Sequence, residues 1–185
     1  MCKLRGGIDI DFIGQINIRV KNDGNGSCLY IEDNGVGMSL RVLTGPLLDF
    51  GTSFWKSSLV QSEFPGLRSS KFKSVGQFGI GFYSVFMGAD KVRVSSKPWN
   101  GGSSDVRQLN FNNGLSLRPL LKNEIPEDFN PIVSTQIKLN LKKGILESTD
   151  EITIKRNLLK AENIEVSIDD YISSICAALD VSVYF

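Results

Sequence analysis

The chain has 185 residues, of which 41% are hydrophobic, a length and composition that suit one domain, or one domain with the beginning of another. Its 21 Lys and Arg residues nearly balance its 20 Asp and Glu residues, and it has neither a membrane-length apolar run nor the apolar centre of a signal peptide, so nucleic acid and membrane partners are not expected. It has no histidine and three scattered cysteines (Cys2, Cys28 and Cys176), which excludes histidine-dependent nucleophilic catalysis, most zinc sites and a disulfide framework, and predicts a cytoplasmic protein.

Two antiparallel strands are predicted near the start of the chain. Residues Gly14 to Val20 alternate apolar and polar side chains, as a strand with one buried face does. The composition of Lys21 to Ser27 is typical of a hairpin turn, and Cys28 to Glu32 alternates again.

The run D-N-G-V-G-M, from Asp33 to Met38, follows the second strand. An aspartate in this position can simply cap the next turn. Alternatively, the two glycines let a flat ring lie against the backbone, where the Asp33 carboxylate can accept a hydrogen bond from an exocyclic amine such as that of adenine. Met38 would then form an apolar wall. This run alone leaves both interpretations open.

Residues Ser39 to Ser74 are predicted to be less regular. Apolar residues from Leu40 to Phe50 recur at helical spacing until Gly45-Pro46 interrupts them. The whole segment, which ends in a basic and serine-rich stretch from Arg68 to Lys73, is typical of a functional lid or mobile loop. The cations of that stretch are interpreted as a solvated loop rather than as phosphate ligands.

A glycine-rich turn leads into an apolar helical run between Ser74 and Phe86, with the sequence S-V-G-Q-F-G-I-G-F-Y-S-V-F. A helix that begins here would direct unpaired N–H groups and the positive end of its dipole at an anion, most often a phosphate. Tight turns also need glycine for structural reasons, so this turn alone leaves a purely structural role open.

The remaining pattern predicts strands at Lys91 to Ser96, Val106 to Phe111, Leu115 to Leu117 (after the hairpin signal Asn113-Gly114), Thr135 to Leu141 and Val181 to Phe185. It predicts helices at Thr149 to Ala161 and from a capping box at Ser167 to about Leu179. The predicted fold class is α+β: a two-layer sandwich with a mostly antiparallel mixed sheet and helices on one face.

The two glycine motifs and the stretch between them resemble the ATP-binding domain of the 90-kDa heat-shock chaperone family. The similarity runs in order from about Gly14 to Leu141 and includes S-V-F-M-G-A-D-K-V-R-V-S-S-K. This family shares a superfamily with DNA gyrase, histidine kinases and MutL, and G-Q-F-G-I-G-F-Y-S resembles the chaperone version. The resemblance implies a Bergerat-type ATP-binding fold and ATP or ADP as ligand, with magnesium in a complete protein. It also implies protein clients and a homodimeric parent protein.

The resemblance implies which residues contact the base. Asp33 would accept the adenine amino group, and Gly35 would shape the turn. Gly37 and Met38 would line the base, and Thr135 would reach it, often through water.

The resemblance also implies which residues contact the phosphates. Backbone N–H groups would come from Gly79, Ile80, Gly81 and Phe82. Gly51 and Thr52 match a pair in the lid of the family. No catalytic residue and no metal ligand is assigned.

Two departures from the family pattern separate the chain from a complete ATPase. Asp49 stands in place of an asparagine near the ligand, where its charge would repel phosphate or need a metal, so it receives no role. The family also has an E-x-x-x-N helix before the adenine aspartate, whose glutamate polarises water and whose asparagine holds magnesium. The residues before Asp33 lack that pattern. We expect little or no hydrolysis, because a positioned base contributes about 100- to 10,000-fold in rate.

The predicted organisation is a chaperone-like ATP-binding domain at residues 1–145, without its first strand and catalytic helix, and a helical extension at 146–185 that leads toward a following domain. Two functions stay open. The first is an ATP-binding domain that couples nucleotide binding to conformational change on client proteins. The second is a degenerate interaction module that keeps the fold alone. A DNA-topology or repair ATPase is disfavoured by the second glycine motif and the neutral charge.

Overall fold

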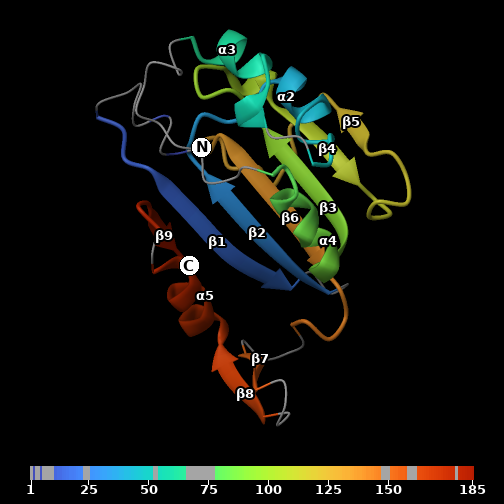
Figure 1. Cartoon of the computed structure of the whole chain (residues 1–185), viewed down its shortest axis with the longest axis vertical. Helices are drawn as coiled ribbons and strands as arrows, with labels where there is room; N and C mark the ends of the chain where they lie inside the picture. Colours follow the sequence, from blue (N-terminus) through green and yellow to red (C-terminus); the bar gives the residue numbers. More distant parts are fainter. Residues whose placement is uncertain are drawn as a thin grey trace.

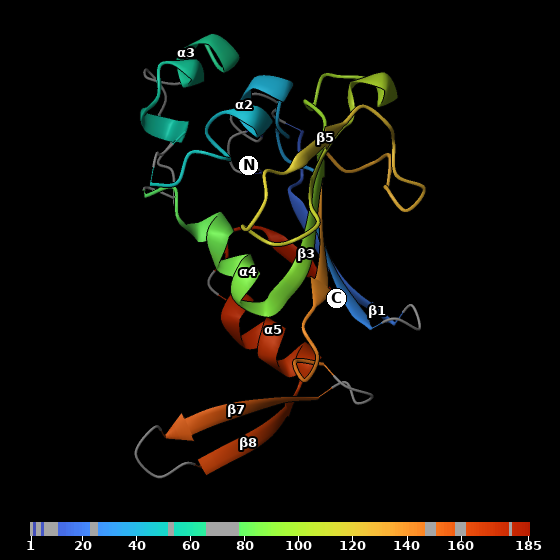
Figure 2. The same cartoon turned by 90° about the vertical axis from the view of Figure 1, so that its right-hand side faces the viewer.

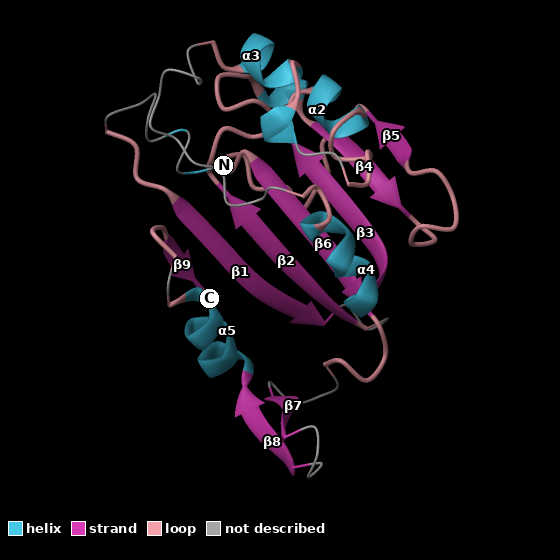
Figure 3. Ribbon diagram, viewed as in Figure 1, coloured by secondary structure: helices cyan, strands magenta, loops and turns pink. Residues whose placement is uncertain are grey.

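The computed structural model describes residues 2, 5, 11–22, 26–51, 54–65, 78–146, 151–157, 162–177 and 179–185. Its main feature is a seven-stranded sheet in the order β5-β4-β3-β6-β2-β1-β9 (Figures 1 and 3). The strands are β1 (Gln15–Asn22), β2 (Ser27–Asp33), β3 (Ala89–Ser96), β4 (Arg107–Phe111), β5 (Leu120–Lys122), β6 (Thr135–Leu141) and β9 (Ser182–Tyr184). All neighbours are antiparallel except β1 and β9. The prediction of an α+β fold with a mixed sheet is confirmed.

The helices of the described residues are short. They are α2 (Leu40–Thr44), α3 (Leu59–Glu63), α4 (Val85–Gly88) and α5 (Ile168–Cys176), with 3-10 turns η1 (Phe54–Lys56), η3 (Gly81–Ser84) and η4 (Ser103–Asp105). Figure 2 shows α2, α3 and α4 on the same side of the sheet. No helix in this described part is long and apolar enough to cross a membrane.

The side-chain alternation of β3 shows how the two faces of the sheet differ. Val92 and Val94 are buried in the main apolar core, whereas Arg93 between them points to the opposite face. The core consists of Leu43, Ala89, Val92, Val94, Leu109, Phe111 and Leu139. Phe82 and Phe86 pack on Phe111 at ring-centroid distances of 5.7 and 5.1 Å. These aromatic contacts hold η3 and α4, and with them the end of the glycine-rich turn, on the core face.

The predicted helix at Thr149 to Ala161 is wrong. The described part of this segment is the strand β7 (Glu151–Asn157), which pairs with β8 (Glu162–Ser167) in a separate two-stranded sheet. Ile152 and Ile154 are two residues apart, which is strand spacing, and both are β-branched, which favours a strand over a helix.

The predicted strand at Leu115 to Leu117 is also wrong, because the turn after β4 is longer than a two-residue hairpin. Gly114 has a φ of +55°, and Ser116 N–H donates to the carbonyl of Asn113 at 3.1 Å. The partner of β4 is therefore β5, which begins at Leu120.

The C-terminal part of the chain returns to the main sheet. As predicted, Ser167 caps α5: its hydroxyl accepts the Asp170 N–H at 3.1 Å. The predicted terminal strand is β9, which pairs in parallel with β1. The predicted domain boundary at residue 145 stays a prediction. Strand β9 lies after that boundary in the sequence and belongs to the main sheet.

The face of the sheet opposite the helices carries a charged network that the sequence did not predict. Asp128, in the connection between β5 and β6, makes an ion pair with Arg93 and a second one with Lys138 at 3.4 Å. It also accepts a hydrogen bond from the Tyr30 hydroxyl at 3.1 Å. Burial alone would raise the pKa of Asp128, but the two cations and the Tyr30 hydroxyl outweigh it and hold the pKa below its usual value.

Replacement of Asp128 by asparagine is expected to lower the free energy of unfolding by about 1–3 kcal/mol at pH 7, because it leaves a half-buried Arg93 without its carboxylate. The stability contributed by Asp128 is present above the unfolded-state pKa of the carboxyl and is lost as the pH falls through its lower folded-state pKa. Urea denaturation of both proteins at neutral and acid pH measures the difference, which should shrink in acid. Glu124→Gln, which breaks an exposed pair with Lys122, is the control and should cost below about 1 kcal/mol. An unchanged difference in acid would contradict the prediction.

Candidate nucleotide site

Three polar side chains meet at the ends of three neighbouring strands. Asp33 is the last residue of β2 and pairs in register with Thr135, the first residue of β6. Thr135 in turn pairs with Ser96, the last residue of β3. Because Asp33 follows Leu29 and Ile31 at the two-residue period, all three point to the core face of the sheet. The structure therefore brings together the carboxylate and the threonine that were predicted to contact the base.

The Asp33 carboxyl is partly buried, and few of the described residues form hydrogen bonds with it. Its Oδ1 accepts the Gly35 N–H at 2.9 Å, and the Cys2 thiol lies 4.0 Å from the same oxygen. Within the described residues, no other hydrogen bond reaches the Asp33 side chain. Burial raises the pKa of the Asp33 carboxyl above its usual value, and the Gly35 N–H offsets part of that rise. In the described part of the chain Oδ2 has no hydrogen-bond donor, so it can accept one from a ligand.

The loop from Gly35 to Met38 is tied to the end of β3. Met38 N–H donates to the Ser96 hydroxyl at 2.9 Å, and that hydroxyl is also 2.9 Å from the Thr135 hydroxyl. Gly37 has a φ of +66°, and a Cβ placed there would lie 1.8 Å from the carbonyl oxygen of Lys97. Gly37 is predicted to lie against the ring of a ligand. The structure adds a packing requirement that holds without any ligand.

The two glycines at the end of the glycine-rich turn, Gly79 and Gly81, differ in backbone conformation. Gly79 has a φ of +66°, a conformation that favours glycine for backbone reasons. Gly81 has no positive φ, and a Cβ there would meet no atom of a described residue within 4 Å. Ile80 is about half exposed, and Phe82 packs on the core. The first part of the motif, Ser74 to Gln77, lies outside the described residues.

A contact that the sequence did not predict joins this turn to the start of the lid-like segment. The Tyr83 hydroxyl donates to the carbonyl of Leu48 at 2.6 Å, and the rings of Tyr83 and Phe50 meet edge to face at 5.0 Å. Burial and the nearby Asp49 carboxylate raise the pKa of Tyr83. Gly51 follows with a φ of +80°, and Thr52 lies outside the described residues. The predicted phosphate turn and the predicted lid thus lie side by side.

One cavity borders the predicted base site without coinciding with it. It has a volume of about 250 Å³, and its lining includes Gly37, Phe54 and Trp99 but neither Asp33 nor Gly81. Among the described residues, no group of three or more His, Cys, Asp or Glu side chains could hold a metal ion.

The comparisons with known proteins point to one class of relatives. No family model matches the chain. It is 31% identical over 148 residues to the mitochondrial heat shock protein 75 kDa of Bos taurus, a match that covers 80% of this chain and 20% of that protein. It is 32% identical over 150 residues to the chloroplastic heat shock protein 90-5 of Arabidopsis thaliana, covering 80% and 18%. It is 30% identical over 161 residues to the chaperone protein HtpG of Colwellia psychrerythraea, covering 84% and 23%.

These similarities support a heat-shock-chaperone-like domain that occupies most of this chain. The chain spans about a fifth of the length of the curated relatives it matches. Because mitochondrial and chloroplastic proteins are among them, the cytoplasmic location stays a prediction.

Proposed function

We propose that this domain binds ATP or ADP through a Bergerat-type site and belongs to a heat-shock-chaperone-like ATPase that couples nucleotide binding to conformational change on client proteins. The observation that carries the proposal is the partly buried Asp33 carboxyl, whose Oδ2 has no hydrogen-bond partner among the described residues and which ends a strand beside Thr135 and before Gly37 and Met38. The exocyclic amine of adenine is a donor of the kind that such a carboxylate accepts.

Gly81 supports the phosphate half of the proposal. Neither its φ nor its surroundings require glycine, so the structure offers no packing reason for the missing side chain. A glycine at this position would instead let a phosphate approach the backbone N–H groups of residues 79–82 closely. Magnesium would bind together with the phosphates, because Mg²⁺ in nucleotide sites takes much of its coordination from phosphate oxygens and water.

The second candidate function is an interaction module that keeps this fold and does not use ATP. The observation that favours it is the placement of Cys2 and Arg5. The Arg5 side chain donates to the carbonyl of Asn34 at 2.6 Å, and the Cys2 thiol lies 3.5 Å from the Asn34 side chain. Two residues from the start of the chain therefore contact Asn34, next to the proposed base site.

Calorimetric titration of ATP and ADP into the purified chain, with and without Mg²⁺, separates the two functions. We expect saturable binding at one site and no measurable turnover. GTP carries a carbonyl oxygen where adenine has its amine, so it should bind at least about tenfold more weakly, a difference of about 1.4 kcal/mol. An absence of saturable binding by either adenine nucleotide would exclude the first function for this chain.

Gly81→Ala tests the phosphate turn. The added methyl group fits the free protein, so the unfolding transition should stay unchanged. It would occupy the space next to the backbone N–H groups, so ATP affinity should fall by at least about tenfold. Adenosine, which has no phosphate, serves as the control ligand and should bind the variant and the wild type equally. Unchanged ATP affinity would remove Gly81 from the proposed site.

A further inference from the structure

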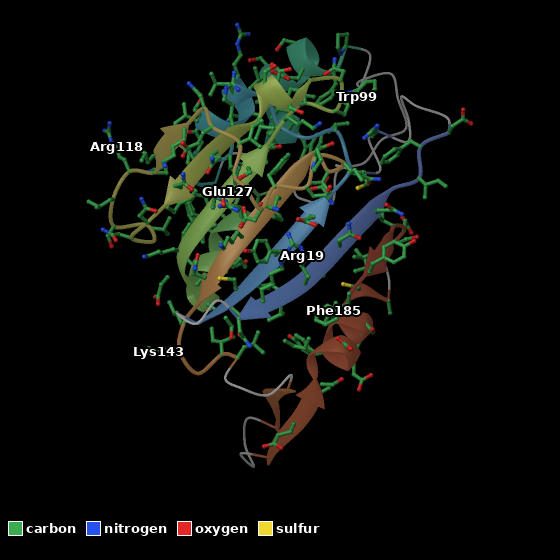
Figure 4. All side chains as sticks on the ribbon, turned by 180° about the vertical axis from the view of Figure 1, so that it is seen from behind. Arg19, Trp99, Arg118, Glu127, Lys143 and Phe185 are labelled. Carbon is green, nitrogen blue, oxygen red and sulfur yellow. The ribbon has the colours of Figure 1, made fainter. Side chains whose placement is uncertain are left out.

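A second hollow lies on the opposite face of the sheet from Asp33 and Thr135. Its volume is about 640 Å³, within the usual range for ligand pockets. Its floor includes Arg93 of β3 and Asn110 of β4, which pair in register and point away from the core. Its wall is formed by residues 124–128, which connect β5 to β6. Figure 4 views the molecule from this side and shows Glu127 over the sheet.

The wall of this groove is held in place before any ligand binds. Gln108 Nε2 donates to the carbonyl of Glu124 at 2.6 Å, and Gln136 Nε2 donates to the carbonyl of Asp128 at 2.7 Å. The ion pair of Asp128 with Arg93 adds a third connection between wall and floor. A preformed groove lowers the ordering cost of binding.

The groove also has unused hydrogen-bonding capacity. The Nε of Arg93 is buried and has no acceptor in the described part of the chain. The side-chain amides of Asn110 and Asn112 line the groove and make no hydrogen bond to another described residue. Carbonyl oxygens of a ligand can accept hydrogen bonds from these two side-chain amides.

The charges of the groove favour a cationic ligand. Lys122 pairs with Glu124 at 2.6 Å, and Arg93 pairs with Asp128, which leaves Glu127 without an ion pair among the described residues. Ile125 lines the groove and is 49% exposed, and Leu120, which pairs in register with the lining residue Asn110, is 51% exposed. Within the described residues, the groove and its edge thus offer a carboxylate without an ion pair, side-chain amides without hydrogen-bond partners and two exposed apolar side chains.

We propose that this groove binds an extended segment of a partner polypeptide in which Lys or Arg stands next to an apolar residue. A peptide backbone supplies the alternating donors and acceptors that asparagine amides match. The cation would contact Glu127, and the apolar residue would lie on Leu120 and Ile125. Three carboxylates in the lining disfavour a phosphorylated ligand, and the polar floor disfavours a purely apolar one. The proposal does not depend on nucleotide binding, because the two sites are on opposite faces of the sheet.

The experiment uses a fluorescein-labelled octapeptide of alternating Lys and Val, with a Glu and Val octapeptide as the matched probe. Fluorescence anisotropy with the full chain should show saturable binding of the Lys peptide, and binding of the Glu peptide at least about tenfold weaker. Glu127→Gln and Asn110→Ala should each lower the affinity for the Lys peptide by at least about threefold, since each removes a charged or hydrogen-bonding partner.

Glu165→Gln changes an exposed carboxylate of β8 and should leave peptide binding unchanged. The proposal would be overturned if the two peptides bound equally or if the Lys peptide did not saturate the protein below about 1 mM. It would also be overturned if Glu127→Gln and Glu165→Gln had equal effects on peptide binding. Urea denaturation of each variant identifies a loss of fold. ATP titration of Glu127→Gln should match the wild type, so failure of the groove and failure of the nucleotide site remain distinguishable.

Discussion

Replacement of Gly37 by alanine is expected to unfold the chain or to lower its free energy of unfolding by at least about 4 kcal/mol. Two independent costs combine at this position. The φ of +66° disfavours any residue with a Cβ. The Cβ itself would lie 1.8 Å from the carbonyl oxygen of Lys97, and that backbone is fixed because Lys97 N–H donates to the Ser134 carbonyl at 2.9 Å. Urea denaturation monitored by circular dichroism measures the loss.

Gly51→Ala is the matched control for this prediction. Gly51 has a φ of +80°, but a Cβ there would meet no atom within 4 Å. This variant should therefore show only the backbone cost, about 1–2 kcal/mol. If both variants lost the same stability, the contact with Lys97 would have no energetic importance, and the loop from Gly35 to Met38 would be less constrained than the structure indicates.

The sheet and part of the site were predictable where the sequence pattern is local. The alternation in β1, β2, β3 and β6 identified those strands, because each has one apolar face. Asp33 was found because it ends such a strand and two glycines follow it. Thr135 was found through the resemblance to heat-shock chaperones, and its place beside Asp33 depends on strand pairing between residues 102 positions apart, which no local pattern encodes.

The errors and omissions have a common physical origin in contacts that are distant in sequence. Ile152 and Ile154 alone have strand spacing, whereas the longer pattern that includes Leu158 and Leu159 predicts a helix. The pairing of Ile152 with Val166 and of Ile154 with Ile164 decides for the strand. No local pattern marks Asp128, because nothing near it in the sequence indicates Arg93 or Lys138. The packing of Gly37 against Lys97 was likewise invisible, since it depends on the path of a different strand.

Asp33→Asn is expected to weaken ATP and ADP binding by about 100-fold or more, a loss of about 3 kcal/mol. An asparagine here has one acceptor oxygen where aspartate has two. If that oxygen accepts the Gly35 N–H, as Oδ1 does now, the amide NH₂ faces the adenine amine, and two donors meet. If the side chain turns over, the Gly35 N–H loses its acceptor. Either arrangement leaves a donor unsatisfied in a partly buried place, and calorimetric titration measures the result.

The same substitution is expected to stabilise the free protein at pH 7, which separates loss of a ligand contact from loss of fold. Burial raises the folded-state pKa of Asp33, so its ionisation costs folding free energy. That cost is absent below the usual range of a carboxyl group and is fully present once the pH has risen through the raised pKa. Asparagine carries no charge, so its advantage should be seen at pH 7 and disappear near about pH 3.

The control variant is Asp90→Asn, which changes an exposed carboxyl at the start of β3 and should change neither stability nor binding. If Asp33→Asn lowered both the nucleotide affinity and the free energy of unfolding, Asp33 would have a structural role. If Asp33 binds the nucleotide, the substitution should lower the affinity and raise the free energy of unfolding.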